Sequence, residues 1–398
     1  MPTGLYISVP FCRSKCSYCN FASDVFSRTI FQGYVERICA DLRQAQNAAA
    51  EVGGYLENQV DSIYLGGGTP TLLDIAGLEL VFVTISQNFQ VATDAEITVE
   101  CAPGTLSDAV IEALVRCGVN RVSLGVQSFV DQEARSVGRL HTRAVVLDDI
   151  ARLRQAGISN INVDLIAGLP HQTTASWLAS VDEAIRTGTP HVSVYMLEVD
   201  EDSRLGSELI AGGTKYHAHF VPDEDLTADM YEAACDRLQS AGIEQYEISN
   251  FARPEKQSRH NLKYWLRKPY LGLGVDAHSM LIYRDAGSRA VRFSMPDSLD
   301  GYMRSPHREK TVVSATAFLQ EAFFLGLRLN RGIDLEELRK EFGKAAVDTQ
   351  AEVIADLVGV GLLRSEGARV FLTSRGRLLS NEVFQRFLSL EKVGENSQ

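Results

Sequence analysis

The chain has 398 residues, of which 45% are hydrophobic and 23% charged, and a formal net charge of −12. This length can bury a large core and allows roughly two to three domains, and the ordinary composition excludes a disordered chain. No apolar run reaches membrane-spanning length. The excess of acidic residues opposes the neutralisation of phosphates on which nucleic-acid binding depends, so nucleic acid is not an expected partner.

The N-terminus and the cysteine count indicate the compartment and the use of the cysteines. Cys12 follows Met1 too closely to leave room for a signal peptide, so we expect a cytoplasmic protein. Seven is an odd number of cysteines, which argues against a disulfide framework and for metal or catalytic use of those that cluster. Four scattered cysteines are expected as small buried hydrophobic residues: Cys39, Cys101, Cys117 and Cys235.

The first 250 residues alternate short β-branched runs with longer amphipathic segments. The runs predict strands at residues 5–9, 62–65, 95–100, 121–125, 160–166 and 191–197. Apolar positions at three- and four-residue spacing predict helices near residues 29–50, 74–88, 107–117, 144–156, 175–187 and 224–241. Strand and helix in regular succession predict an α/β fold, in which residues 1–250 form a partial (β/α)6 barrel.

The unusual residue clusters of this half all follow predicted strands. They are Cys12 after the first strand, Gly66-Gly67-Gly68-Thr69-Pro70 after the second, Glu100 closing the third, Gln127 after the fourth and Asp164 late in the fifth. Ligands of parallel sheets gather at the carboxyl ends of the strands. The agreement between these separate signals predicts one binding site at that end of the barrel.

The rest of the chain divides into two parts. Residues 251–310 have weak periodicity and are expected to form an irregular connector. Residues 311–398 return to a helical pattern followed by a hairpin pattern, which predicts a small winged-helix-like C-terminal domain. This domain has 11 lysine and arginine residues against 12 acidic ones, so it lacks the basic surface of a DNA reader.

Cys12, Cys16 and Cys19 form a C-x3-C-x2-C run. A structural zinc ion takes four ligands, whereas a 4Fe–4S cluster held by three thiolates keeps one iron open to another ligand. The run therefore favours a cluster with an open iron. A zinc-stabilised scaffold that uses these cysteines and one distant residue stays as an alternative.

With an aromatic residue before its last cysteine and the Gly66–Pro70 loop behind it, this run resembles that of the radical S-adenosylmethionine superfamily. The resemblance implies a 4Fe–4S cluster on the three cysteines, with S-adenosylmethionine on the open iron. Consecutive glycines suit close backbone approach to such a ligand. Glu100 would be too costly to bury unpaired, so we expect a ribose hydroxyl or a cation beside it, with a salt bridge to Arg121 as the purely structural alternative.

Residues 121–129, 138–141 and 163–170 narrow the resemblance to the oxygen-independent coproporphyrinogen III oxidase group. Matching positions implies a first S-adenosylmethionine site at Tyr6, Gly67 and Glu100, and a second site at Tyr18, Gly68, Thr69, Gln127, Arg139 and Asp164. The likeness extends over nearly the whole chain.

Two departures separate the chain from the oxidase itself. The oxidase pattern has a further cysteine two residues past the third, where this chain has Asn20 and Phe21, and it carries a longer N-terminal cover. The chain is instead similar to the heme-chaperone branch of the group. Its H-N-x-x-Y-W motif implies His260 as a heme ligand, with Tyr264 and Trp265 beside the porphyrin.

Two further sets of histidines could contact metal. His278 follows a glycine-rich turn and is the second-choice heme ligand. His217 and His219 form an H-x-H pair with no third ligand near in sequence, so we interpret them as surface residues.

The leading hypothesis is a cytoplasmic heme chaperone that delivers heme to recipient proteins and has no catalytic residue of its own. The resemblance implies cluster-dependent dimerisation and association with membrane-bound respiratory partners, which would place the protein at the inner face of the membrane. The alternative is an enzyme that cleaves S-adenosylmethionine and decarboxylates coproporphyrinogen III, with the cofactor supplying the difficult chemistry.

Overall fold

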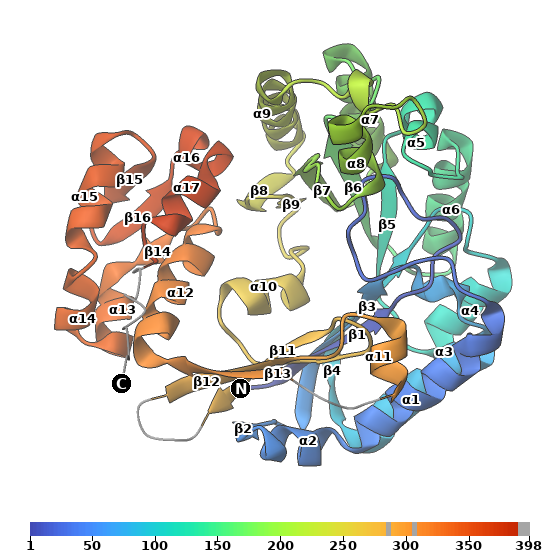
Figure 1. Ribbon diagram of the computed structural model, residues 1–398, viewed down its shortest axis with the longest axis horizontal. Coiled ribbons are helices and arrows are strands. Elements are labelled where there is room, and N and C mark those ends of the chain that lie inside the picture. The colour runs from blue at the N-terminus through green and yellow to red at the C-terminus, as the bar shows by residue number, and fades with distance from the viewer. Residues whose placement is uncertain (284–287, 305–308, 389–398) are drawn as a thin grey trace.

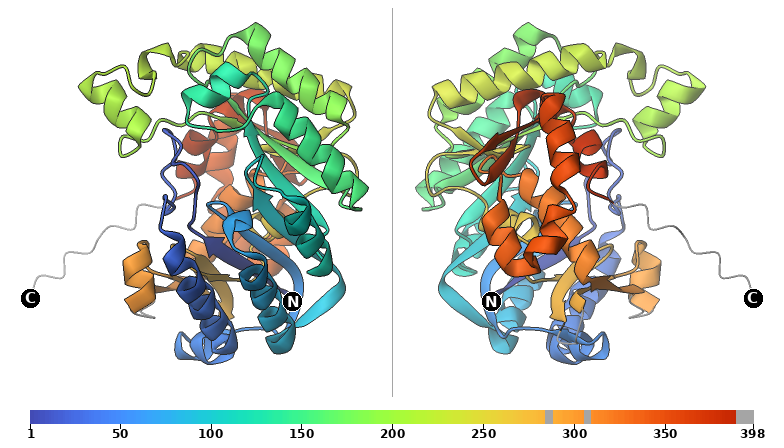
Figure 2. Two further views of the ribbon diagram at one scale, coloured as in Figure 1. Left: turned by 90° about the vertical axis from the view of Figure 1, so that its right-hand side faces the viewer. Right: turned by 90° about the vertical axis from the view of Figure 1, so that its left-hand side faces the viewer.

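One large curved sheet organises the chain, with helices along its outer side and a smaller helical domain facing its open side (Figure 1, Figure 2). The computed structural model describes residues 1–283, 288–304 and 309–388. Within these ranges the strands form a 13-stranded sheet and a separate three-stranded sheet. None of the described helices combines the length and apolar character that a bilayer span requires.

Six neighbouring parallel strands form the centre of the large sheet, and all six were predicted. They pair side by side in chain order. The strands are β1 (Thr3–Val9), β3 (Gln59–Gly67), β4 (Gln90–Cys101), β5 (Arg121–Gln127), β6 (Asn160–Ala167) and β7 (His191–Met196). The predicted α/β fold with a partial barrel is therefore confirmed.

The helices between these strands are also those predicted, with one division. The predicted helix near residues 29–50 is two helices that meet at Gln44. The crossover helices are α1 (Phe31–Arg43), α2 (Ala45–Glu51), α3 (Ile75–Asn88), α4 (Asp108–Arg116), α6 (Arg143–Gln155), α7 (Thr174–Thr187) and α9 (Glu224–Ser240). Short elements that the periodicity did not reveal are η1 (Arg28–Ile30), η2 (Pro70–Leu72), α5 (Asp131–Ser136), α8 (Arg204–Ala211) and η3 (Ala218–Phe220).

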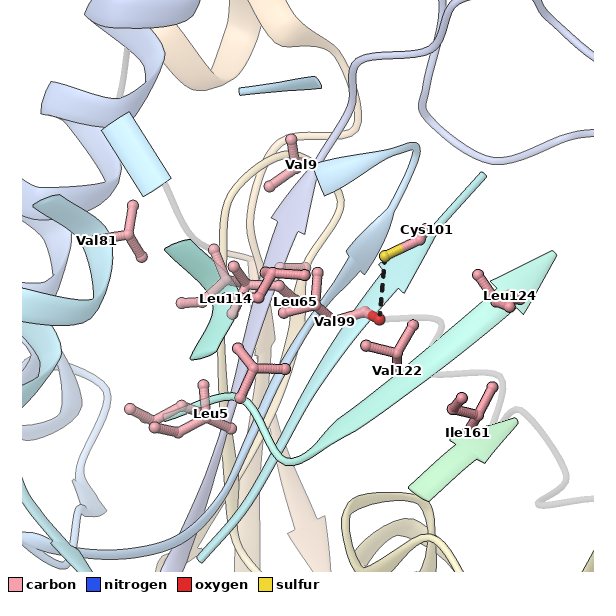
Figure 3. Packing of buried hydrophobic residues seen from close by; sticks show 14 of the residues in the cluster. Leu5, Val9, Leu65, Val81, Val99, Cys101, Leu114, Val122, Leu124 and Ile161 are labelled. Carbon is pink, nitrogen blue, oxygen red and sulfur yellow. Dashed lines mark hydrogen bonds between the residues drawn. The ribbon is translucent and has the colours of Figure 1, made fainter. Parts of the chain in front are cut away.

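The core lies between the outer face of the strands and the helices. Side chains on a strand alternate between its two faces, so one set faces the helices and the other faces the barrel interior. Figure 3 shows the outer set, with Leu65, Val99 and Val122 gathered beside Val81 of α3 and Leu114 of α4. Burying this apolar layer leaves the remaining positions of each strand to line the interior, where the site lies.

The scattered cysteines have the environment of packing residues. Cys39 and Cys101 are buried, and Cys117 and Cys235 are partly buried. Burial raises the pKa of the Cys101 thiol, which keeps it protonated and inert.

Residues 251–310 differ from the irregular connector that the sequence predicted. Together with residues 244–250 they add short strands to both edges of the sheet. Periodicity did not reveal these strands because they are short and interrupted by turns. Near the β7 edge lie β8 (Glu244–Glu247) and β9 (Asn250–Ala252), and beyond β1 lie β10 (Tyr270–Leu273), β11 (His278–Tyr283), β12 (Ser288–Ser294) and β13 (Glu309–Ser314), with β2 (Gly54–Tyr55) against β11 and α11 (Leu299–Arg304) before β13. Helix α10 (Arg259–Trp265) spans the open side between the two edges (Figure 1).

The C-terminal part is helical with a small antiparallel sheet, as predicted, although its boundary and that of the connector stay predictions. Its elements are α12 (Ala315–Leu327), β14 (Ile333–Asp334), α13 (Leu335–Phe342), α14 (Lys344–Asp348), α15 (Ala351–Gly359), β15 (Leu363–Glu366), β16 (Arg369–Leu372), α16 (Ser374–Leu378) and α17 (Ser380–Gln385). It has its own apolar core. Arg267, two residues past α10, joins it to the barrel through two 3.0 Å bonds to the Glu341 carboxylate.

Candidate functional site

The three predicted cluster cysteines lie in a loop directly after β1. All three are unpaired and partly exposed. Backbone bonds tie the loop to itself, including Cys12 N to Asp24 O at 2.9 Å, and Lys15 Nζ donates to the carbonyls of Phe21 and Ser23, both at 2.7 Å. These bonds hold the cysteine loop in one conformation.

The three thiols lie close enough to influence one another. Burial is the main cause that raises the pKa of Cys12, and charge on Cys19 and Cys16 raises it further. A raised pKa means that the thiolate is disfavoured in the loop. Because a bound metal stabilises the thiolate, coordination offsets this cost. Among the described residues, no three of His, Cys, Asp and Glu converge on a position for a single ion. A cubane binds each thiolate through a different iron, so it does not require the three thiols to converge on one ion. The zinc-scaffold alternative stays a prediction.

The glycine loop after β3 is fixed against the stem of the cysteine loop. Gly68 N donates to Val9 O at 2.8 Å, and Thr69 N donates to Phe11 O at 2.7 Å. A Cβ on Gly68 would lie 2.7 Å from Phe11 O and 2.9 Å from Val9 O. Position 68 therefore requires glycine because it lies against the backbone of the cysteine loop. Gly67 has a φ of 99°, which turns the chain and also favours glycine.

Glu100 closes β4 beside this loop. Its carboxylate accepts from the Tyr64 hydroxyl at 2.7 Å and from Gly67 N at 3.1 Å. No ion pair between Glu100 and Arg121 is found in the described part of the chain, so the structural alternative for Glu100 does not hold. Burial raises the pKa of Glu100 to about 7, against the lowering effect of its two hydrogen bonds.

Tyr6 shares the interior with Glu100. Its ring centroid lies 6.1 Å from that of Tyr64, and burial and the charge of Glu100 raise the pKa of its hydroxyl. The residues predicted for the first S-adenosylmethionine therefore come together at one place.

Of the residues predicted for a second ligand, Tyr18, Gln127 and Asp164 lie around the guanidinium of Arg139. Gly68 and Thr69 are instead hydrogen-bonded to the stem of the cysteine loop. Arg139 donates to the Tyr18 hydroxyl at 3.2 Å, and both Arg139 and the Gln127 amide lie 3.1 Å from where a Cβ on Gly125 would be. The Nε of Arg139 is buried and has no partner among the described residues. Against the effect of burial, the pKa of Arg139 is raised by Tyr18 and Cys16 and then by the charge of Asp164.

Polar neighbours fix Asp164 in the barrel. Its carboxylate accepts from Asn162 Nδ2 at 2.7 Å and Ser123 Oγ at 3.1 Å, while burial raises its pKa. Asn162 also pairs with His191, whose Nδ1 lies 2.6 Å from Asn162 Oδ1. Sequence analysis missed Ser123, Asn162 and His191. Polar residues at every second position of β4, β5, β6 and β7 were the signal that could have revealed this lining.

Arg121, which the sequence analysis named only as an alternative partner of Glu100, also lines the barrel. It is fully buried, and its Nε has no hydrogen-bond partner in the described ranges. Its neighbours in register, Thr98 and Asn160, also carry buried oxygen atoms without partners. One layer of the barrel therefore holds polar groups that the chain itself leaves unsatisfied.

The H-N-x-x-Y-W motif lies on α10, at the opposite end of the interior from the cysteines. The Glu96 carboxylate accepts from the backbone N of Arg259 and of His260, at 3.0 and 2.9 Å, which fixes the start of this helix. His260 is completely buried, with Nδ1 3.0 Å from Ser62 Oγ and Nε2 2.9 Å from the Tyr264 hydroxyl.

These contacts bear directly on the predicted heme ligand. Burial lowers the pKa of His260 to about 3, so the ring is neutral, but both of its nitrogens are already occupied. Tyr264 stacks edge-on to Tyr270, and Trp265 lies under the Arg328 guanidinium at 4.2 Å. Heme ligation by His260 stays a prediction, and it requires this packed motif to open.

The other histidines named in the sequence analysis lie at two separate places on the surface. His278 is exposed and lies 3.7 Å from the Asp276 carboxylate. His217 is partly exposed and His219 is exposed, which agrees with their interpretation as surface residues. The loop after β6 also brings His171 beside them, with ring centroids of His171 and His217 5.0 Å apart.

The donor set at the mouth of the barrel fits a 4Fe–4S cluster with S-adenosylmethionine. Three free thiols from one loop supply cluster ligands. The buried Glu100 carboxylate and the unpartnered Nε of Arg139 supply opposite charges for the ammonium, hydroxyl and carboxylate groups of the ligand.

Comparisons with known proteins agree with this geometry. Residues 6–184 match the family model of the radical SAM superfamily, and residues 313–379 match the HemN C-terminal domain. The chain is 33% identical to the heme chaperone HemW of Lactococcus lactis over 97% of both chains, and 32% identical to that of Bacillus subtilis over 96% of this chain and 98% of the relative. The structure is similar to Escherichia coli coproporphyrinogen III oxidase (HemN), with a TM-score of 0.80 and 22% identity over 97% of this chain and 90% of that one.

Replacing Gly68 with alanine is expected to damage the cysteine loop, because the new Cβ would meet backbone atoms of Val9 and Phe11 that cannot turn away. We expect a loss of about 1–3 kcal/mol in the free energy of unfolding and lower iron and sulfide content after anaerobic reconstitution. Gly359→Ala on α15 is the control, since nothing lies within 4 Å of its added Cβ. Equal iron content in the two variants would contradict this prediction.

Glu100→Gln is expected to change the pH dependence of stability. Between the ordinary pKa of 4.5 and about 7 the folded chain keeps a proton that the unfolded chain has lost, so the free energy of unfolding falls as pH rises through this window. Glu100 should account for a fall on the order of 1–3 kcal/mol, which glutamine abolishes. Urea unfolding from pH 5 to 8 measures it, with the exposed Glu382→Gln as control. The same slope in all three proteins would refute the assignment.

Proposed function

Since the chain belongs to the HemW heme-chaperone family of the radical SAM superfamily, we propose that it binds heme and delivers it to recipient proteins, on a scaffold that holds a 4Fe–4S cluster and S-adenosylmethionine. The observation that carries the proposal is the relation to proteins named heme chaperone over 97% of both chains. The two family models match residues 6–184 of the barrel and residues 313–379 of the C-terminal domain, so the likeness is not confined to one cofactor site.

The site residues at the carboxyl ends of the strands and in the cysteine loop have distinct roles in this proposal. Cys12, Cys16 and Cys19 would hold the cluster, and Glu100 and Arg139 would orient the amino-acid and ribose groups of S-adenosylmethionine. When bound, these groups supply one-electron chemistry. Glu100 keeps its carboxyl group within the barrel through Tyr64 and Gly67, so it is positioned before any ligand arrives.

The exposure of the cysteine loop favours a carrier over an enzyme that shelters a radical. Phe21, at the position of the fourth cysteine of the oxidase pattern, is 66% exposed, and Asn20 turns away to donate to the Asp200 carboxylate at 2.9 Å. A reactive intermediate needs water to be excluded. The side chains after Cys19 provide no such cover.

Recipients and location complete the proposal. We infer a cytoplasmic protein that works at the inner face of the membrane with respiratory enzymes as heme recipients, and that dimerises when its cluster is present. The exposed apolar side chains beside the cysteine loop, such as Phe21 and Val25, supply contact surface for such assembly.

Anaerobic reconstitution with parallel assays tests the function. We expect roughly four irons and one heme per chain, transfer of heme to an apo heme protein, and no turnover of coproporphyrinogen III with S-adenosylmethionine and a reductant. The triple variant Cys12→Ser, Cys16→Ser, Cys19→Ser should lose the cluster spectrum, and Cys117→Ser should keep it. Porphyrinogen decarboxylation with 5′-deoxyadenosine release would favour the enzyme instead.

The role of His260 has its own test. If heme iron takes His260, Tyr264→Phe should strengthen heme binding, because it removes the hydroxyl that occupies Nε2. His260→Ala should then abolish the histidine-ligated Soret band. If neither variant alters the heme titration while both keep the cluster spectrum, His260 is a packing residue that closes the barrel.

A further inference from the structure

Three imidazoles of the chain gather at one place on the surface outside the barrel. His141, His191 and His260 are buried and hydrogen-bonded, and His307 lies outside the described residues. His278 pairs with Asp276. The other three of the eight histidines are His171, His217 and His219.

These three histidines surround one aromatic side chain. The Phe220 ring lies 4.1 Å from the His171 ring and 4.2 Å from the His219 ring, between centroids, and is itself 47% exposed. His171 N donates to Phe220 O at 3.0 Å, and Phe220 N donates to His217 O at 2.9 Å. We call this group the histidine rim. In the left view of Figure 2 the lime-coloured segment that carries η3 projects at the upper edge of the molecule.

The backbone of the histidine rim is fixed by hydrogen bonds, but its imidazole nitrogens have no hydrogen-bond partner among the described residues. Both oxygens of Glu208 on α8 accept backbone N–H groups, from Tyr216 at 2.7 Å and Ala218 at 3.1 Å. His171 and His217 have φ angles of 66° and 62°, a region that costs energy for residues other than glycine. Across the described residues, no hydrogen bond uses a ring nitrogen of the three histidines.

We propose that the histidine rim is a heme-iron site, in which an imidazole of His171, His217 or His219 ligates the iron and Phe220 packs against the porphyrin. This inference rests on the proposed heme-carrier function and names the surface that first takes the heme. Imidazole is a standard axial ligand of heme, and aromatic rings pack on its face.

Two observations favour heme over a free cation. The three imidazoles do not converge on a position for one ion, whereas heme iron needs only one or two axial ligands. Lys215, two residues before His217, carries its ammonium 5.1 Å above the Tyr216 ring and supplies a positive charge for a propionate. Burial, followed by the charges of His217 and His219, lowers the pKa of His171, which favours the neutral ring that iron binds.

Titration of hemin into the full-length, reconstituted chain tests the proposal. The variant His171→Asn, His217→Asn, His219→Gln removes the imidazoles while asparagine tolerates the positive φ angles. We expect at least about tenfold weaker heme binding and a shifted Soret band, with the exposed Glu382→Gln unchanged as the control. Unchanged affinity and spectrum in the triple variant overturn the proposal.

A second measurement needs no variant. Diethylpyrocarbonate labels accessible imidazoles, so bound heme should protect His217 and His219 but leave His278 reactive. Failure to protect them, with heme bound, overturns the histidine rim and leaves the carrier function standing. A wild-type chain that binds no heme refutes both. Zinc ion alone that is captured by the wild type and lost in the triple variant, with heme binding unchanged, identifies a cation site instead.

Discussion

The structure depends on a parallel sheet that is buried on both faces. The outer positions of its central strands are mostly apolar and pack under helices, so the buried polar side chains at the alternate positions are directed into the barrel. Inside, each must find a partner or bear a desolvation cost. Glu96 binds the backbone of α10, Glu100 binds Tyr64 and Gly67, and Asp164 binds Asn162 and Ser123. The functional site is the part of this network that the chain does not complete.

The two ends of the barrel meet this constraint in different ways. At the end near α10, Glu96, Ser62 and His260 satisfy one another, and the helix lies across the open side of the sheet (Figure 1). At the carboxyl end of the strands, Arg139 keeps a buried nitrogen without a partner and three thiols are free within the described chain. Unpaired polar atoms also occur around Arg121, so it is the three thiols, together with Arg139, that assign the cofactors to the second end.

Much of this could be predicted from the sequence because its signals are local. The β-branched runs marked all six central strands, and the spacing of Cys12, Cys16 and Cys19 marked the loop after the first. What could not be predicted were contacts across the fold. Short strands such as β10 and β11 show no period, and the partners of Glu100 come from a neighbouring strand. His171 lies 46 positions before His217, so no spacing rule joins them.

A carrier must release heme as well as bind it, and the burial of its ligand decides how readily it does so. Ligation by His260 would first break the bonds to Ser62 and Tyr264 and expose a neutral, desolvated ring. That cost weakens binding by about tenfold for each 1.4 kcal/mol. An imidazole at the surface carries no such cost, and a ligand from a recipient protein can approach the same iron directly. The exposed histidines are therefore suited to exchange, and the buried one to holding the barrel closed.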